Sequence, residues 1–249
     1  MVSGLLGKKV GMTQLFDDKG DVRPITVLQA GPCVITQKKT AQKDGYEAVQ
    51  VGLVEFVKGK NMGKPMQGHF AKHDLPPVKY MKEFPLLPDD VPASAEGENG
   101  GDTKVGDKIL VSIFVDDKFV DVSGVSKGRG FAGTVKRHKF GGGPKSHGHM
   151  FQVQGSIGSS SFPSRVFKGL RMPGHMGDVK VTVRNLRIIG IDLDDNLLMV
   201  EGAVPGAKGS YVVISKAKKP PRERRGFAGS TTVDPLKAAK KAAQAAKKK

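Results

Sequence analysis

Alternating hydrophobic and polar residues run through much of the chain and predict β-strands. The pair of segments at residues 11–16 and 22–29 flanks a turn rich in Asp and Gly, which predicts an antiparallel hairpin. Within residues 179–187, valines at 179, 181 and 183 alternate with polar residues, as expected of a half-buried strand. This strand is expected to span residues 179–192, and the remaining strands are expected at residues 34–38, 46–54, 108–115, 197–200 and 210–215.

Helical periodicity is nearly absent from these segments, whereas hairpin turns such as residues 194–196 are frequent. This pattern predicts a mainly β protein built on a closed or nearly closed antiparallel β-barrel. We assign the barrel body to residues 1–57, 105–125 and 178–215. It is interrupted by an irregular, proline-rich insertion at 58–104, with a short helix near 78–83, and by a long extended loop at 126–177.

The charge of the chain is concentrated in two segments. Its formal net charge is +17, and the loop at 126–177 holds nine Lys and Arg residues, twelve glycines and no Asp or Glu. The tail at 216–249 holds twelve basic and two acidic residues, which leaves the rest of the chain nearly neutral. A neutral body with basic extensions is typical of a protein that binds a polyanion.

The loop composition favours RNA over a membrane as that polyanion. Its cations are interspersed with Gly, Phe and His, and no amphipathic helical period runs through them. The loop also has too little apolar content to form a core of its own, so we expect RNA to order it. The tail is expected to stay disordered until RNA binds.

Other features narrow the class of protein. Cys33 is the only cysteine, which excludes an intramolecular disulfide, and its apolar neighbours predict simple burial. No run approaches the roughly 18 apolar residues of a membrane span, and the N-terminus lacks a signal-peptide pattern. We therefore expect a cytoplasmic protein that contacts no membrane and binds no small-molecule substrate.

The entrance of the loop, residues 126–133, places cations and glycines at alternate positions. Glycine lets backbone amides approach phosphates closely, Arg129 can donate two parallel hydrogen bonds, and Phe131 can stack on a base. The alternative is a flexible linker that happens to be basic, which fits poorly with a charge bias over fifty residues. The G-x-G-x-x-G spacing here is not a dinucleotide site, because no βαβ unit surrounds it. Its Arg-Gly-Phe-Ala-Gly sequence recurs at 225–229 in the tail.

No catalytic residue, metal site or cofactor is predicted. The loop histidines lack the thiols and carboxylates that would complete a zinc site, and its serines lack an activating base. We expect these basic and aromatic residues to contact RNA: Lys127, Arg129, Phe131, Lys136, Arg137, His138, Lys139, Lys145, His147, His149, Arg165, Lys168, Arg171 and His175.

Residues around the loop entrance also match a family signature, which fixes nine positions in 24 residues: Phe114, Asp121, Gly124, Ser126, Gly128, Arg129, Gly130, Gly133 and Arg137. Further matching segments lie at 4–13, 155–158, 166–169, 172–177 and 202–206. With these residues the chain resembles the L-three family of large-subunit ribosomal proteins over residues 1–215, and the proline-rich insertion and the tail are the divergent parts.

The resemblance implies a structural component of the large ribosomal subunit, with a β-barrel of the translation-protein type. Members bind 23S-type rRNA near its 3′ end, help to nucleate assembly, and extend a loop towards the peptidyl transferase centre. On this chain the middle of that loop, residues 145–162, should reach deepest. The resemblance also implies neighbours from the L-fourteen and L-nineteen families. Bacterial members often carry a methylated glutamine where this chain has Ser159, so no such modification is expected there.

Two other functions remain open at this point. The chain could be an enzyme acting on RNA, with the barrel as catalytic domain and the loop as a clamp. It could also be a free-standing nucleic-acid chaperone that is indifferent to RNA sequence and structure.

Overall fold

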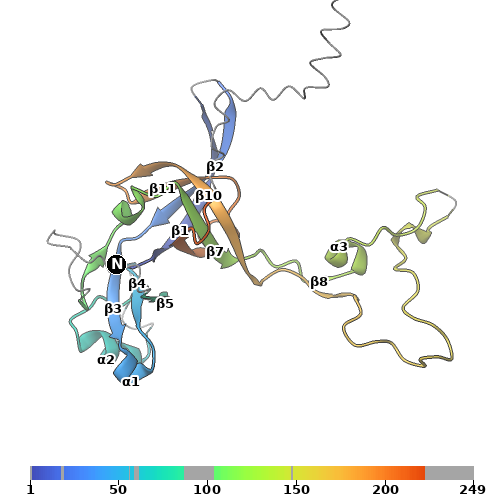
Figure 1. The fold of residues 1–249 in the computed structure, drawn as a ribbon, viewed down its shortest axis with the longest axis horizontal. Helices are drawn as coiled ribbons and strands as arrows, with labels where there is room; N and C mark the ends of the chain where they lie inside the picture. Colours follow the sequence, from blue (N-terminus) through green and yellow to red (C-terminus); the bar gives the residue numbers. More distant parts are fainter. Residues whose placement is uncertain are drawn as a thin grey trace, which may run out of the picture. The chain divides into compact units, whose positions relative to one another are not determined.

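The main structural unit is an antiparallel barrel. The computed structural model describes residues 2–17, 20–55, 57–58, 62–86, 104–146 and 148–221. Six strands pair in a closed ring, in the order β1–β12–β7–β10–β11–β2, and every pair is antiparallel (Figure 1). The mainly β, antiparallel prediction is confirmed. The six strands are β1 (Gly4–Phe16), β2 (Val22–Ala30), β7 (Phe119–Val125), β10 (Lys180–Asp192), β11 (Leu197–Glu201) and β12 (Tyr211–Lys216).

Four other strands form a second sheet, which is separate from the barrel ring in its strand pairing. Its order is β5–β4–β3–β6, again antiparallel throughout. The sequence assigned residues 34–38 and 46–54 to the barrel body, and this assignment is wrong, because both strands pair within the second sheet. Alternation predicts a strand but does not say which sheet it joins. The strands are β3 (Cys33–Lys39), β4 (Ala48–Leu53), β5 (Met81–Pro85) and β6 (Lys108–Ile109).

The described part of the proline-rich insertion is more regular than the sequence indicates. It contains helix α2 (Lys64–Ala71), with Pro65 in its first turn, and strand β5. The helix predicted near 78–83 is wrong, because Lys82 and Phe84 pair with Val51 and Val49 of β4. Phe84 is buried there, so long-range pairing overrides the local preference. The low-complexity stretch at 95–102 lies outside the described residues.

The short helices complete the connections between strands. Helix α1 (Ala41–Asp44) joins β3 to β4 and ends at Gly45, whose φ of 81° closes the turn. The strand predicted at 108–115 is only partly correct, because η3 (Val111–Phe114), a 3₁₀ helix, follows β6. Val111 and Phe114, three residues apart, both point into the core, which fits a three-residue turn. None of the described helices has the length and apolar character needed to span a membrane.

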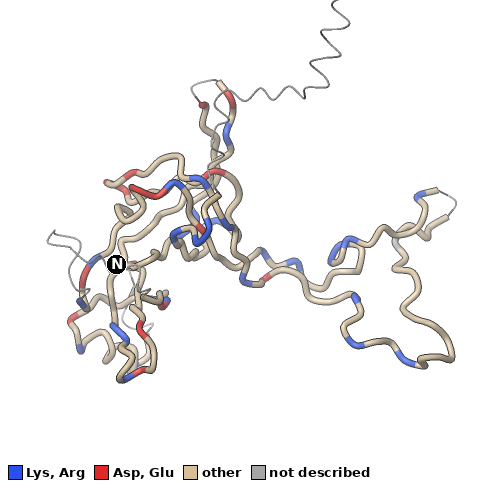
Figure 2. Tube along the Cα trace, in the orientation of Figure 1, with Lys and Arg blue, Asp and Glu red and all other residues tan. Residues whose placement is uncertain are grey.

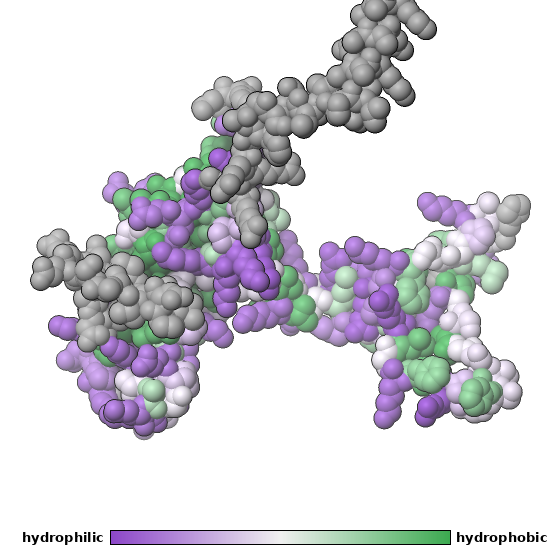
Figure 3. Space-filling model, in the orientation of Figure 1, coloured by the Kyte–Doolittle hydropathy of each residue, from purple (hydrophilic) through white to green (hydrophobic). Residues whose placement is uncertain are grey.

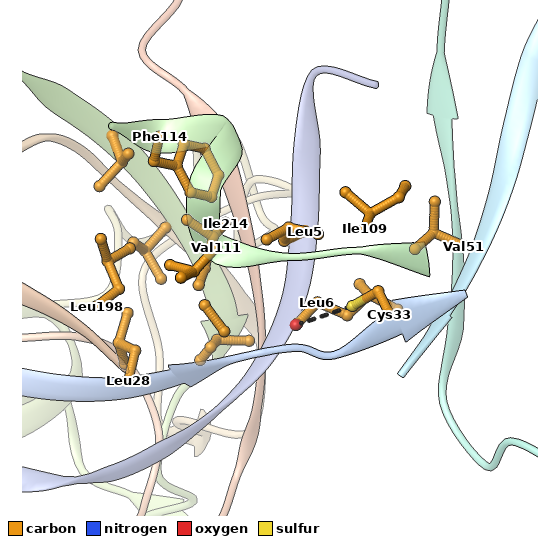
Figure 4. Packing of buried hydrophobic residues seen from close by; sticks show 14 of the residues in the cluster. Leu5, Leu6, Leu28, Cys33, Val51, Ile109, Val111, Phe114, Leu198 and Ile214 are labelled. Atoms are coloured by element: carbon orange, nitrogen blue, oxygen red, sulfur yellow. Dashed lines mark hydrogen bonds between the residues drawn. The ribbon is translucent and has the colours of Figure 1, made fainter. Parts of the chain in front are cut away.

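One hydrophobic cluster joins the barrel interior to the second sheet. It contains fully buried Leu5, Leu28 and Phe114 together with Val51 of the second sheet (Figure 4), and Ile35 of β3 belongs to the same cluster. At roughly 25 cal/mol per Å² of buried apolar area, such side chains each contribute about 1.5–3 kcal/mol. The barrel and the second sheet therefore share one core and stabilise each other.

Cys33 lies inside this cluster, as predicted. Its side chain is buried, and its thiol Sγ lies 3.3 Å from the carbonyl oxygen of Leu6, to which it donates (Figure 4). Burial raises the pKa of the thiol to about 12. The neutral thiol is therefore the stable form in the folded protein.

We predict that Cys33 stays unmodified in the folded protein at pH 8 and reacts only after unfolding. A thiol reagent added with and without urea, followed by mass determination, measures this. Because the folded pKa lies above the unfolded value of about 8.5, the thiol also lowers stability as pH rises from about 8.5 towards 12. Rapid labelling in the absence of denaturant would contradict the buried position.

Candidate nucleic-acid interface

The basic loop leaves and re-enters the barrel at adjacent strands. Strand β7 ends at Val125 and β10 begins at Lys180, and these two residues pair with each other. The two chain segments stay paired beyond the barrel, since the Arg129 amide donates to the Met176 carbonyl at 2.8 Å and the Met176 amide donates to the Gly130 carbonyl at 2.9 Å. Strands β8 (Phe131–Ala132) and β9 (Gly174–His175) continue this ladder. We call the paired segments 125–132 and 174–180 the loop root.

The first residues of β10, next to the root, do not pack against the barrel core. The alternation at 179–187 predicted burial of every second residue, but Val179 is 52% and Val181 is 39% exposed. Val183 is the first of the three valines to pack against the core. The expectation of a half-buried strand is therefore wrong for Val179 and Val181, because β10 pairs with β11 only from Ile188 onwards and its first residues extend past that pairing.

Two residues of the signature stabilise this root from the barrel side. The buried carboxylate of Asp121 accepts a hydrogen bond from the Asn185 amide at 2.8 Å, beside the irregularity where β10 shifts register against β7. At Gly124, an added Cβ would lie 3.2 Å from the Pro205 carbonyl oxygen, so glycine permits an approach of the β11–β12 connection that any side chain would push back by a few tenths of an ångström.

A glycine also fixes the return segment of the root. Gly177 has a φ of 78°, and an added Cβ would lie 2.9 Å from both the Arg129 nitrogen and the Gly128 Cα, with the Lys127 carbonyl oxygen closer still. These are backbone atoms, so no side-chain rotation can relieve the contact. The two segments can pair here only because residue 177 is glycine; at Gly128 an added Cβ would meet only the Asp178 Cβ, at an ordinary 3.7 Å.

We predict that Gly177→Ala opens the root, at a local cost of about 2–5 kcal/mol from positive-φ strain and steric overlap. Hydrogen exchange at the Arg129 and Met176 amides, which donate across the root, should accelerate. Gly130→Ala is the matched control, because Gly130 also has a positive φ but nothing within 4 Å of an added Cβ. Equal exchange in the two variants would show that the close approach is not limiting.

Helix α3 (Thr134–His138) packs against the return segment. The Arg137 guanidinium Nη1 donates to the Met172 carbonyl at 2.8 Å, and Nε2 of His138 lies 3.1 Å from the same oxygen. Arg137 is nevertheless exposed, so it can hold helix α3 to residue 172 and still present its positive charge to solvent. Among the predicted contacts, the structure thus brings Arg137 and His138 together at one backbone oxygen.

The other loop cations point into solvent. All nine Lys and Arg residues are exposed, and none of them forms an ion pair within the described part of the chain. Figure 2 shows the loop carrying only blue segments, whereas the barrel and second sheet carry both signs. Cations that are neither buried nor neutralised remain available for an external anion. They are Lys127, Arg129, Lys136, Arg137, Lys139, Lys145, Arg165, Lys168 and Arg171.

Exposed apolar side chains alternate with these cations along the loop. Phe131 is 80% exposed, and Figure 3 shows hydrophobic and hydrophilic surface mixed along the loop. Phe162 was missed by the sequence reasoning, although it is 88% exposed and lies among serines close to the cation Arg165. The Arg165 guanidinium lies over the Phe167 ring, 5.6 Å from its centroid. These rings and cations can stack on unpaired bases.

Lys9 is a further residue that the sequence did not single out. Its side chain is 7% exposed, and Nζ donates to the carbonyls of Val204 at 2.7 Å and Gly206 at 3.3 Å. Burial, and then the nearby charge of Lys127, lower the pKa of Lys9. Lys9 thus holds the β11–β12 connection that packs on Gly124.

The remaining predicted residues are placed individually along the loop. His149 and His175 are exposed, with His175 paired opposite Phe131 in the β8–β9 ladder, and Met150–Gln152 form the 3₁₀ turn η4. Within the described ranges, no three His, Cys, Asp or Glu residues come together as a metal site would require. His147 and the repeated motif at 225–229 lie outside the described residues.

Comparison with known proteins identifies the family. Residues 102–196 match the family model described as ribosomal protein L3. A protein of Koribacter versatilis named "Large ribosomal subunit protein uL3" is 69% identical over 249 residues, which covers both chains completely. This chain belongs to the ribosomal protein L3 family. The family predicted from the signature is thereby confirmed.

Two less similar members of the L3 family also match most of this chain. The protein of the same name from Solibacter usitatus is 51% identical over 220 residues, covering 88% of this chain and all of the relative. The one from Thermotoga petrophila is 46% identical over 217 residues, covering 87% of this chain and 98% of the relative. The L3 similarity therefore extends over the barrel, the second sheet and the loop.

Proposed function

We propose that this L3 family protein is a structural constituent of the large ribosomal subunit, in the cytoplasm, and that it acts by binding rRNA rather than by catalysis. The observation that carries the proposal is the set of nine exposed loop cations, which have no acidic residue among them and no ion pair within the described part of the chain. A polyanion is the natural counterpart of such a surface.

We propose further that the loop, residues 126–177, threads between packed helices of 23S-type rRNA near its 3′ end. Its exposed cations would neutralise phosphates, and Phe131 and Phe162 would stack on unpaired bases. The glycines suit this role, since a chain passing between RNA helices has little room for side chains. Binding free energy would come largely from counterion release.

The barrel provides the fixed support for the loop in this proposal. We place it in the translation-protein type of β-barrel, resting on the subunit surface and helping to nucleate assembly. The middle of the loop, residues 145–162, would reach towards the peptidyl transferase centre. Replacements there should allow assembly and alter peptidyl transfer or the antibiotic response, whereas replacing both Arg129 and Arg137 by Ala should impair assembly. Neighbours from the L-fourteen and L-nineteen families would complete the surroundings of the barrel.

Sedimentation tests the proposal against an enzyme and a free chaperone. A ribosomal constituent travels with the large subunit through a sucrose gradient in a ratio near one to one, and it stays bound at moderate salt. An RNA-modifying enzyme is substoichiometric and dissociates. A free chaperone spreads over all RNA fractions. Either of these two outcomes would overturn the proposed function.

A further inference from the structure

The first hairpin extends beyond the barrel. Strand β1 pairs with β12 only over Gly4–Lys8, and β2 pairs with β11 only over residues 25–29. Residues 14–16 pair with 22–24 and with no third strand, as Figure 1 shows beside the label of β2, whereas residues 11–13 pair with 25–27, which β11 pairs on the other side. We call residues 11–16 and 22–24 the hairpin ribbon. Its outer part, 14–16 with 22–24, is a two-stranded segment, which by itself is marginally stable in water.

One face of the hairpin ribbon is apolar. Phe16 pairs with Val22 and Gln14 pairs with Pro24, so these side chains lie on the same side as Met12, two residues along. Met12 is 52%, Phe16 68% and Val22 54% exposed. Leu15, 38% exposed, lies on the other face with Arg23, and Gln14 is the polar residue among the apolar ones of the Met12 face. Three exposed apolar residues on one face, unlike single scattered ones, mark an interaction surface.

The charge of the hairpin ribbon disfavours RNA as its partner. Arg23 is the one cation among its described residues, and its guanidinium is engaged by Asp17 at 2.7 Å and by Glu201 at 3.0 Å. Asp21, at the turn, is exposed. Lys208 approaches Gly11, which lies on the opposite face from Met12. Acidic groups beside an apolar face complement a basic protein and repel phosphates.

We propose that the Met12–Phe16–Val22 face is a docking surface for a basic protein of the large subunit. The partner would place an apolar side chain on this face and a Lys or Arg beside Asp21. The inference rests on the proposed function, because it assumes that the partner is another protein of the same ribosomal subunit. It goes beyond the RNA-binding role of the loop, since it assigns a protein contact to the hairpin ribbon, whose one described cation, Arg23, is paired with Asp17 and Glu201.

Photo-crosslinking within purified large subunits tests the docking surface. Gln14 is replaced by p-benzoylphenylalanine, which lies on the apolar face between Met12 and Phe16. We expect one subunit protein to be crosslinked, through a segment that contains Lys or Arg. Adding Phe16→Thr and Val22→Thr, which keep the β-propensity, should reduce the crosslink about tenfold. Val115→Thr with Leu193→Thr, two residues 57% and 55% exposed on other parts of the chain, should leave it unchanged.

The outcomes separate the two proposals. If the protein fails to sediment with the subunit, the proposed function and the docking surface fall together. If it sediments but the crosslink joins rRNA alone, the hairpin ribbon binds RNA and the docking surface is wrong. No crosslink in assembled subunits, or one that the Thr substitutions leave intact, also overturns it.

Discussion

Neutralising four loop cations lowers rRNA affinity about a thousandfold at roughly 0.1 M salt. The variant carries Lys136→Gln, Lys145→Gln, Lys168→Gln and Arg171→Gln, all at exposed positions with no ion pair in the described structure. Each phosphate contact contributes about 0.7–0.9 to the log–log salt slope, so the slope should fall by roughly 3. Titrating transcribed large-subunit rRNA with protein at several salt concentrations measures both quantities.

A matched variant tests whether the loss of affinity comes from the loop cations or from the lower net charge of the protein. Lys43→Gln, Lys64→Gln, Lys72→Gln and Lys79→Gln remove the same charge from exposed positions outside the loop. This control should keep nearly the full salt slope, because those lysines are not expected to contact RNA. Equal losses in the two variants would mean that overall charge governs binding and that the loop has no special role.

Removing the Phe114 ring destabilises the fold by about 3–5 kcal/mol. Phe114 has no exposed surface and lies in the cluster shared by the barrel and the second sheet, so Phe114→Ala leaves a cavity that both units line. Urea unfolding followed by circular dichroism gives the change. Because total stabilities are about 5–15 kcal/mol, the variant should be close to unfolding at 37 °C.

The same substitution at an exposed phenylalanine is the control for Phe114. Phe162 is 88% exposed, so Phe162→Ala should change the free energy of unfolding by less than about 0.5 kcal/mol. Phe114→Leu should cost about 1 kcal/mol, because most of the volume remains. A loss at Phe114 no larger than at Phe162 would place Phe114 outside the core.

The parts of the fold that local patterns determine could be predicted. The β1–β2 hairpin has its turn and both strands within one short stretch, and the loop boundaries follow from charge alone. Strand β5 could not be predicted, since Phe84 is held by pairing with Val49, 35 residues earlier. The same applies to β3 and β4, whose alternation does not specify a sheet.

In the candidate nucleic-acid interface, too, local features could be predicted from the sequence and long-range contacts could not. Residue type and charge predicted which side chains face solvent, and the nine Lys and Arg side chains of the loop do. The pairing of the root was not predictable, because it depends on Gly177 meeting Gly128 across about fifty residues. The exposure of Val179 and Val181 depends equally on where the barrel ends, which no local period encodes.

The pairing of Val125 with Lys180 lets the loop change length at little cost to the barrel. The two ends of the loop lie on neighbouring strands about 4.8 Å apart, so the loop connects them in the same way as an ordinary hairpin turn. Closure entropy rises by only about 0.6 kcal/mol for each doubling of loop length. Insertions or deletions beyond the root can therefore accumulate while the barrel folds as before, and the barrel can close before any RNA is present.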